Sequence, residues 1–175
     1  MWITSPPVWW NKYFVKELFS MVDEEDEFVL LTDGGHFDNM GVYTVLQRCC
    51  ETIIAVDNGA DPNREFEDLA GVLRKARIDL GITIDIKLNE LHGDPVTKHA
   101  ARGFAEGTIL YPEGETGRFI YLKPTLTGKE SEDILQYDRK HKDFPQETTL
   151  DQFFDEAQFE SYRELSYQIT KKAIE

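Results

Sequence analysis

Hydrophobic residues in the first half of the chain form short apolar runs that alternate with stretches of helical periodicity. The runs at 28–31 and 52–56 have the length and composition of strands, and residues 82–86 alternate apolar and polar side chains like a third strand. Between them, residues 41–50 and 65–80 place apolar side chains at intervals of three and four, which predicts two amphipathic helices. This alternation of strands and helices is typical of an α/β fold with a mostly parallel sheet and helices packed on its faces.

The second half of the chain has a different pattern. Residues 108–111 and 118–122 flank a turn that contains proline and glycine, which predicts a β-hairpin near an edge of the sheet. Helical periodicity over 131–141 and 155–173 predicts helices at the C-terminal end. We therefore expect a single α/β domain over 1–175, with the hairpin and the C-terminal helices added to the parallel sheet.

Composition and charge narrow the class of protein. The 175 residues are 41% hydrophobic and 12% aromatic, which is typical of a folded domain. A formal net charge of −14 argues against general nucleic-acid binding and against electrostatic attraction to anionic lipid. No aliphatic run approaches the roughly 18 residues that a transmembrane helix needs, and the start has no targeting pattern. We expect a protein without a transmembrane segment in this chain, cytoplasmic or membrane-associated as part of a longer protein.

Cysteines and histidines give no indication of a metal or cofactor. Cys49 and Cys50 are adjacent and lack the spacing of a zinc site, so we interpret them as reduced, mostly buried thiols. His92, His99 and His141 are scattered among polar residues, which is typical of surface or capping histidines. No cofactor is expected.

A candidate site follows the first predicted strand. Asp33 lies where that strand ends, and ligands of open α/β sheets bind just beyond the carboxyl ends of strands. Gly34 and Gly35 allow a sharp turn and the close approach of a substrate. Three interpretations are open: ordinary Asp-Gly turn chemistry, a catalytic general base at Asp33, and a metal site formed by Asp33, His36 and Asp38.

A second pair of acids follows the second predicted strand. Asp57 comes directly after that strand and Asp61 precedes a proline, and both positions are common in turns. We interpret both acids as turn structure, and we expect Asp33 and Asp57 to lie at the same edge of the sheet.

A serine hydrolase needs a nucleophile elbow of the form G-x-S-x-G, and the sequence contains none. No serine lies between glycines in that pattern, among Ser5, Ser20, Ser131, Ser161 and Ser166. A complete acyl-transfer site is therefore not encoded in these residues.

Longer motifs point to a family. The chain closely resembles the later part of bacterial patatin-like phospholipase domains in the runs LTDGGHFDNMGVY, TIIAVDNGADP, FEDLAGVLRKARIDLGI and FDEAQFESYREL. This resemblance implies a three-layer α/β/α fold, here incomplete, and lipid acyl hydrolysis by a serine in a G-x-S-x-G elbow with an aspartate in an Asp-Gly-Gly or Asp-Gly-Ala motif.

The family motif assigns roles to the Asp33 loop. By resemblance, Asp33 is the catalytic aspartate, Gly34 and Gly35 complete its motif, and His36 and Asn39 extend the match, either orienting Asp33 or holding the loop closed. The serine and the glycine-rich oxyanion loop of the family lie upstream and have no match here. The isolated chain is therefore expected to be inactive.

Three functions follow from these observations. The favoured one is the Asp-bearing, C-terminal portion of a patatin-like lipid acyl hydrolase, with a lipid or other acyl ester as substrate and a serine-bearing N-terminal segment as partner. The second is a non-catalytic remnant of the fold that binds lipid or protein. The third is a metal-dependent hydrolase that uses Asp33, His36 and Asp38.

Overall fold

The computed structural model of the protein describes residues 10–19, 21, 23, 25, 33–148, 150 and 152–175. Contacts within the chain divide it into two compact units, residues 1–37 and 38–175, and each is described by itself. The predicted strand at 28–31 lies outside the described residues. In the first unit, helix α1 spans Trp10–Leu18, and the short helix α2 (Gly35–Asp38) crosses the boundary between the units.

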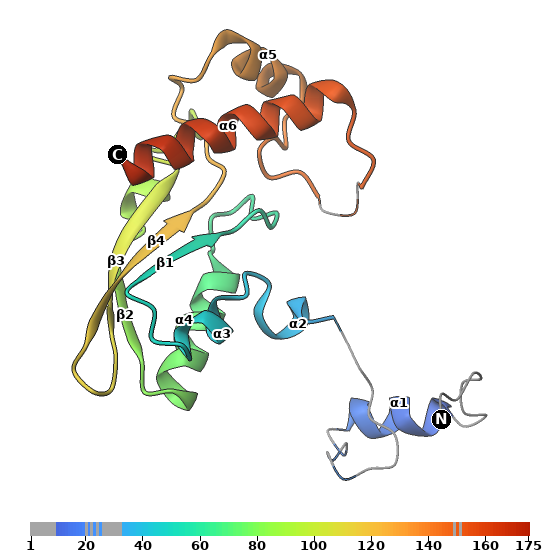
Figure 1. The fold of residues 1–175 in the computed structure, drawn as a ribbon. Helices are drawn as coiled ribbons and strands as arrows, with labels where there is room; N and C mark the ends of the chain where they lie inside the picture. The colour runs from blue at the N-terminus through green and yellow to red at the C-terminus, as the bar shows by residue number, and fades with distance from the viewer. Residues whose placement is uncertain are drawn as a thin grey trace. The chain divides into compact units, whose positions relative to one another are not determined.

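The second unit contains a four-stranded mixed sheet in the order β1-β4-β3-β2 (Figure 1). Its strands are β1 (Thr52–Val56), β2 (Thr83–Ile86), β3 (Phe104–Leu110) and β4 (Thr116–Leu122). Strand β1 pairs with β4 in parallel, whereas β3 pairs with both β4 and β2 in antiparallel orientation. The unit is therefore an α/β structure, as expected.

Two details of the sheet differ from the prediction. Among the described strands, one pairing of three is parallel, so the sheet is mixed rather than mostly parallel. The predicted hairpin, β3 and β4, lies in the middle of this sheet rather than near an edge. The reason is that β4 carries buried side chains on both faces, with Phe119 and Tyr121 on one face and Ile120 and Leu122 on the other. A strand that is apolar on both faces is buried as an inner strand.

Helices α3 (Val42–Leu46) and α4 (Glu67–Asp79) pack on one face of the sheet. The core beneath them combines Leu46 and Leu69 from the helices with Ile53, Ile109 and Phe119 from the strands. The predicted helix at 65–80 is therefore present, while the one at 41–50 is shorter than predicted. The 3₁₀-helix η1 (Asn89–Leu91) adds the buried Leu91 to the same core.

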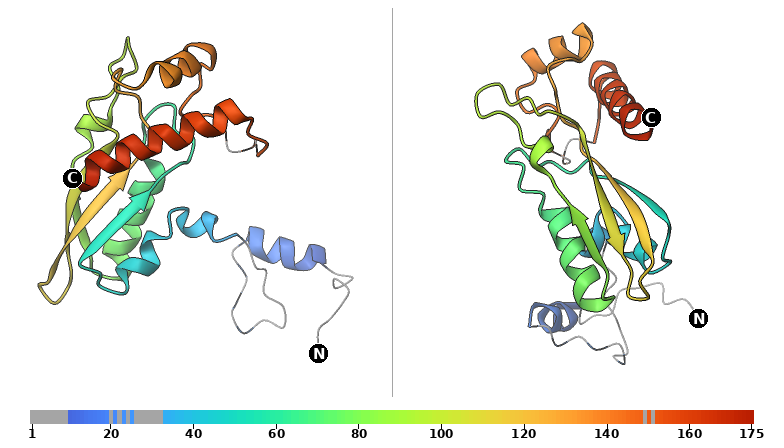
Figure 2. Two further views of the ribbon diagram at one scale, coloured as in Figure 1. Left: turned by 45° about the horizontal axis from the view of Figure 1, so that its top comes forward. Right: turned by 90° about the vertical axis from the view of Figure 1, so that its left-hand side faces the viewer.

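Helices α5 (Glu132–Lys140) and α6 (Glu156–Ile174) form the core on the other face. In the left view of Figure 2, α6 passes in front of the sheet and α4 lies behind it. Leu165 and Ile169 of α6 pack with Ile120, Leu122 and the start of β3. Asp155 begins α6 as its N-cap, because its side chain accepts a hydrogen bond from the Gln158 N–H.

We also find that none of the helices in the described ranges is long and apolar enough to cross a membrane.

Candidate functional site

The two parallel strands end side by side and place an acid next to a base. Val56 is the register partner of Leu122, so the next residues, Asp57 and Lys123, lie together at the carboxyl edge of the sheet. The Asp57 N–H continues the ladder by donating to the Leu122 carbonyl at 3.0 Å. This edge is where α/β proteins place ligands and chemistry.

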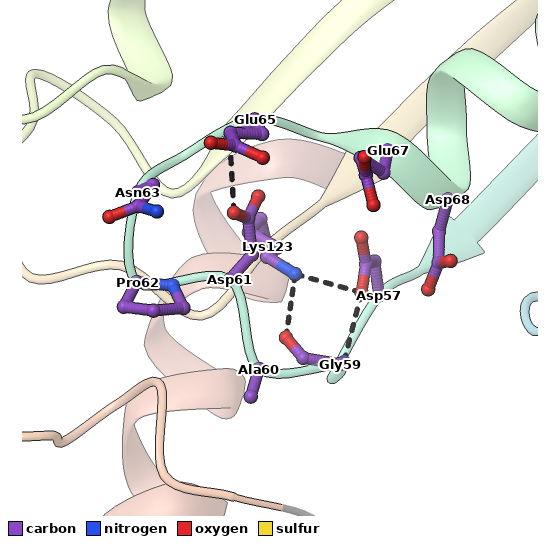
Figure 3. Close-up of a pocket in the computed structure, with 10 residues that line it drawn as sticks. All are labelled: Asp57, Gly59, Ala60, Asp61, Pro62, Asn63, Glu65, Glu67, Asp68 and Lys123. Atoms are coloured by element: carbon purple, nitrogen blue, oxygen red, sulfur yellow. Dashed lines mark hydrogen bonds and ion pairs between the residues drawn. The ribbon is translucent and has the colours of Figure 1, made fainter.

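Asp57 and Lys123 form a buried ion pair that has further polar partners. The Lys123 Nζ donates to Asp57 Oδ1 at 2.9 Å, and the two side chains are 1% and 3% exposed for Lys123 and Asp57 respectively. The same Nζ donates to the Gly59 carbonyl at 2.7 Å, and the Gly59 N–H donates back to Asp57 Oδ1 at 2.9 Å (Figure 3). These contacts compensate the loss of hydration that isolated buried charges would suffer.

Tyr121 completes the network from β4. Its hydroxyl donates to Asp57 Oδ2 at 2.5 Å, so both oxygens of the carboxylate are bonded. Burial raises the pKa of Tyr121, and the hydrogen bond to Asp57 raises it further, which keeps the phenol protonated as a donor. Asp57 is therefore more than the turn residue that the sequence predicts.

The hydrogen bond from the Tyr121 hydroxyl to Asp57 should contribute to the stability of the fold. We expect Tyr121→Phe to lower the free energy of unfolding by about 1.5–3 kcal/mol, because it leaves a buried carboxylate oxygen without its donor. Urea unfolding followed by circular dichroism measures the change. Tyr167→Phe is the matched control, since Tyr167 is 56% exposed, and should cost less than about 0.5 kcal/mol. Equal stability of the two variants would contradict this role of Tyr121.

Asp61 stabilises the loop that follows β1 through hydrogen bonds within that loop. Asp61 Oδ1 and Oδ2 accept hydrogen bonds from the N–H groups of Glu65 and Phe66, at 2.9 and 2.8 Å. The Asp61 N–H donates to the Gln146 side chain at 2.8 Å, and Gln146 donates to the Pro124 carbonyl at 2.7 Å. Asp61 therefore has the structural role that its position before a proline predicts.

A cavity of about 210 Å³ opens beside the buried pair (Figure 3). Five of its lining residues are acids, and the ammonium group of Lys123 is already bonded to Asp57 and Gly59. The cavity therefore disfavours an anionic ligand. It is lined by Asp57, Gly59, Ala60, Asp61, Pro62, Asn63, Glu65, Glu67, Asp68 and Lys123.

Gly59 lies close to two acidic side chains of this cavity. A Cβ atom on residue 59 would lie 3.2 Å from Asp57 Oδ1 and 3.4 Å from Asp68 Oδ2. Asn39, at the end of the predicted site loop, donates from Nδ2 to the same Asp68 oxygen at 3.1 Å. Of the residues predicted for the active-site loop, Asn39 thus contacts a side chain that lines this cavity.

The other predicted site residues form a turn in the first unit. Asp33 Oδ1 accepts the Gly35 N–H at 3.0 Å, and the Asp33 carbonyl accepts the His36 N–H at 3.2 Å. The Gly34 carbonyl accepts the Phe37 N–H at 3.0 Å. Asp33, Gly34, Gly35 and His36 are all exposed. Helix α2 begins at Gly35, two residues after Asp33.

Asp38 has a structural role that bears on the metal hypothesis. Its Oδ1 accepts the Met40 N–H at 3.1 Å and its Oδ2 accepts the Tyr43 N–H at 2.6 Å, so it stabilises the first turn of α3. Within the described ranges, no group of three or more His, Cys, Asp or Glu side chains is arranged to hold a metal ion. The geometry therefore lends no support to a site of Asp33, His36 and Asp38.

Among the remaining candidates, His92 and His141 are exposed, as expected, and His99 is half-buried. Both cysteines are free thiols, but Cys49 is exposed rather than buried. The reason is that α3 ends at Leu46, and Cys49 lies beyond it with a left-handed backbone at φ 51°.

Sequence reasoning missed the two partners of Asp57. The pattern predicts a strand over 118–122, which contains Tyr121 and ends directly before Lys123. A signal was present, because opposite charges directly follow two apolar strands, but it becomes informative only once those strands are known to be parallel neighbours.

Comparison with protein-family models, curated proteins and solved structures finds no match to this chain.

Proposed function

We propose that this chain is the Asp-bearing portion of a patatin-like lipid acyl hydrolase, with a nucleophilic serine supplied by a segment outside it. The observation that carries the proposal is the Asp33 turn, an exposed carboxylate held at the start of α2 within the Asp-Gly-Gly motif. The mixed α/β sheet is consistent with this assignment at the level of fold class. We also propose that the complete protein has the three-layer α/β/α arrangement of that family.

The turn prepares one oxygen of Asp33 for proton transfer. The Gly35 N–H bonds to Oδ1 at 3.0 Å and so orients the carboxylate. Among the described residues, no hydrogen bond is made to the other oxygen, Oδ2. An oriented carboxylate that has one oxygen without a hydrogen bond from the described part of the chain is suited to accept a serine proton as a general base.

In the proposed reaction the serine is first acylated by the ester, and the acyl-serine is then hydrolysed by water. The serine oxygen attacks the ester carbonyl carbon while Asp33 takes the hydroxyl proton, and the carbon–oxygen bond to the alcohol then breaks. Asp33 returns the proton to the departing alcohol. In the second step Asp33 takes a proton from water, the resulting hydroxide attacks the acyl-serine, and the fatty acid leaves as the proton returns to the serine.

The isolated chain should not react as a serine hydrolase. We expect no covalent labelling by a fluorophosphonate probe and no serine-dependent hydrolysis of short acyl esters, because such probes require an activated serine and no G-x-S-x-G segment is present. Mass spectrometry of the purified chain after incubation measures labelling. Stoichiometric modification of any of its five serines would contradict the assignment of the nucleophile to another segment.

A second candidate function is a non-catalytic remnant that keeps the fold to bind lipid or protein. The absence of a nucleophile elbow from these residues favours it. The coding region immediately upstream decides between the two, because the hydrolase requires a G-x-S-x-G segment there and the remnant does not.

A further inference from the structure

Strand β1 is an outer strand of the sheet, and its free edge is unprotected. It stands at one end of the order β1-β4-β3-β2, so β4 pairs with one side of it and no described strand pairs with the other. Its sequence, TIIAV, contains no charged residue and no proline. Natural proteins usually protect an outer strand with a charge, a proline or a covering segment. Within the described part of the chain, β1 therefore offers an edge to which a further strand can pair.

The backbone groups of β1 alternate between its two sides. The Glu51 carbonyl accepts the Arg118 N–H at 2.7 Å, and the Asp57 N–H donates to the Leu122 carbonyl at 3.0 Å. In a parallel pair, alternate residues of a strand bond to the same neighbour, so the odd-numbered residues from 51 to 57 bond to β4. The N–H and C=O groups that point to the free edge are those of Thr52, Ile54 and Val56.

The side chains along this edge are apolar and exposed. Ile54 and Val56 are 49% and 50% exposed. Their register partners in β4, Ile120 and Leu122, are buried in the core that α5 and α6 form on that face of the sheet. The apolar face of the sheet thus continues beyond the part that these helices bury. Covering it would remove apolar surface from water, which favours association.

The outer strand at the other end of the sheet is protected. Strand β2 contains the acidic Asp85, and the basic Lys87 follows directly after its last residue. Charges on an outer strand oppose its pairing with another strand, because they would lose hydration at the new contact. Of the two outer strands of the described sheet, β1 is therefore the one suited to pairing.

Two copies of β1 complement each other in antiparallel orientation. When Ile54 lies opposite Ile54 of the second copy, Thr52 lies opposite Val56 of the second copy. All three residues then direct their N–H and C=O groups into the contact, which gives about six backbone hydrogen bonds. The same surface is used on both copies, as a two-fold axis requires.

The charges at the ends of this pairing permit it. Glu51 would lie opposite Asp57 of the second copy, and two free carboxylates at that distance would repel each other. Asp57, however, is bonded to Lys123 at 2.9 Å, so its charge is compensated within its own copy. The net charge of −14 on each chain still opposes association, and salt screens this repulsion. Added salt should therefore strengthen the contact.

We propose that β1 pairs with β1 of a second copy, antiparallel and with the two-fold axis at Ile54, so that one sheet continues across a dimer. The proposal concerns residues of the second unit alone and does not depend on the Asp33 turn. The oligomeric state therefore tests it separately from hydrolysis.

Sedimentation equilibrium over a range of protein concentrations measures the oligomeric state. We expect the chain of 20.2 kDa to form a reversible dimer. Ile54→Lys should weaken the dimer at least about tenfold, because it places a charge at the centre of the contact. Ile78→Lys is the matched control, since Ile78 is 72% exposed on α4, and it should change the dimer constant by less than about twofold. Circular dichroism verifies that each variant is folded.

A disulfide tests the register of the pairing. Opposed residues of a hydrogen-bonded antiparallel pair have Cα atoms about 5.5 Å apart, which a disulfide can span. In a background of Cys49→Ser and Cys50→Ser, which removes both free thiols, Ile54→Cys should form a linked dimer. Oxidised glutathione serves as the oxidant and takes up the two thiol hydrogens. Ile78→Cys in the same background should form far less of the linked dimer. Gel electrophoresis without reductant measures both yields.

Several results would overturn the proposal. A chain that stays monomeric at every concentration would leave the edge of β1 to another segment or partner. Equal effects of Ile54→Lys and Ile78→Lys, a dimer that added salt weakens, or equal disulfide yields for the two cysteine variants would place the contact elsewhere. If Ile54→Lys does not fold, the disulfide yields decide.

Discussion

Replacing Lys123 by methionine is expected to lower the free energy of unfolding by about 3–5 kcal/mol, because it leaves the Asp57 carboxylate buried without its counter-charge. Lys123 is 1% exposed and Asp57 is 3% exposed, so water cannot take the place of the missing ammonium. The Gly59 carbonyl also loses its donor. Equilibrium urea unfolding, with the midpoint and slope fitted together, measures the loss.

Two further variants make this measurement specific. Lys87→Met is the matched control, since Lys87 also directly follows a strand but is exposed, and it should change stability by less than about 0.5 kcal/mol. In the double variant Asp57→Leu with Lys123→Met, neither charge of the pair remains, so the cost should be smaller than the sum of the two single costs by at least about 1 kcal/mol. Additive costs would show that the pair is not energetically coupled.

In a longer protein that joins an upstream G-x-S-x-G segment to this chain, Asp33→Asn is expected to reduce the rate of ester hydrolysis by at least about 10²-fold. Asparagine keeps the size of the side chain and can still accept the Gly35 N–H, but it cannot take up the serine proton. The fold should therefore survive. Initial rates with a short acyl ester, together with the unfolding midpoint of each variant, provide the test.

Asp38→Asn is the control for this experiment. Asp38 lies in the same loop, and its two hydrogen bonds to the Met40 and Tyr43 N–H groups stabilise the start of α3. Its replacement should leave the rate within a few-fold of the original. Near-full activity of Asp33→Asn would reject Asp33 as the base, and loss of activity in both variants would favour the metal-dependent hydrolase. Asp57→Asn is unsuitable as a control, because Asp57 lies in a buried ion pair.

The periodicity of the sequence predicts several helices and strands of this fold to within a few residues. The strand predicted at 52–56 is β1 (Thr52–Val56), and the helix predicted at 155–173 is α6 (Glu156–Ile174). The helix predicted at 65–80 is α4 (Glu67–Asp79). These segments combine a single regular period with clear boundaries, so local preference and tertiary packing agree. The helix predicted at 41–50 is shorter because its apolar positions continue into a turn after Leu46.

Strand order did not follow from the sequence because it depends on contacts between distant residues. The parallel prediction assumed that strands close in sequence are neighbours, which holds often but not always. Here β1 pairs with β4, and Thr52 has Arg118 as its register partner. The ion pair of the site depends on that pairing, since Asp57 and Lys123 are 66 positions apart. The Asp33 turn, by contrast, depends on local hydrogen bonds and could be predicted.

The position of the hairpin in the middle of the sheet limits how the second unit can be divided. Between residues 52 and 86 the chain has the strand, helix and strand of an apparent βαβ module, yet β1 and β2 make no pairing with each other, because β4 and β3 lie between them. A fragment that ends before Phe104 would therefore retain both outer strands and lose every described backbone ladder of the sheet. Proteolytic dissection or gene truncation at that point should yield an unfolded peptide, and the two halves of the unit should refold only when they are present together.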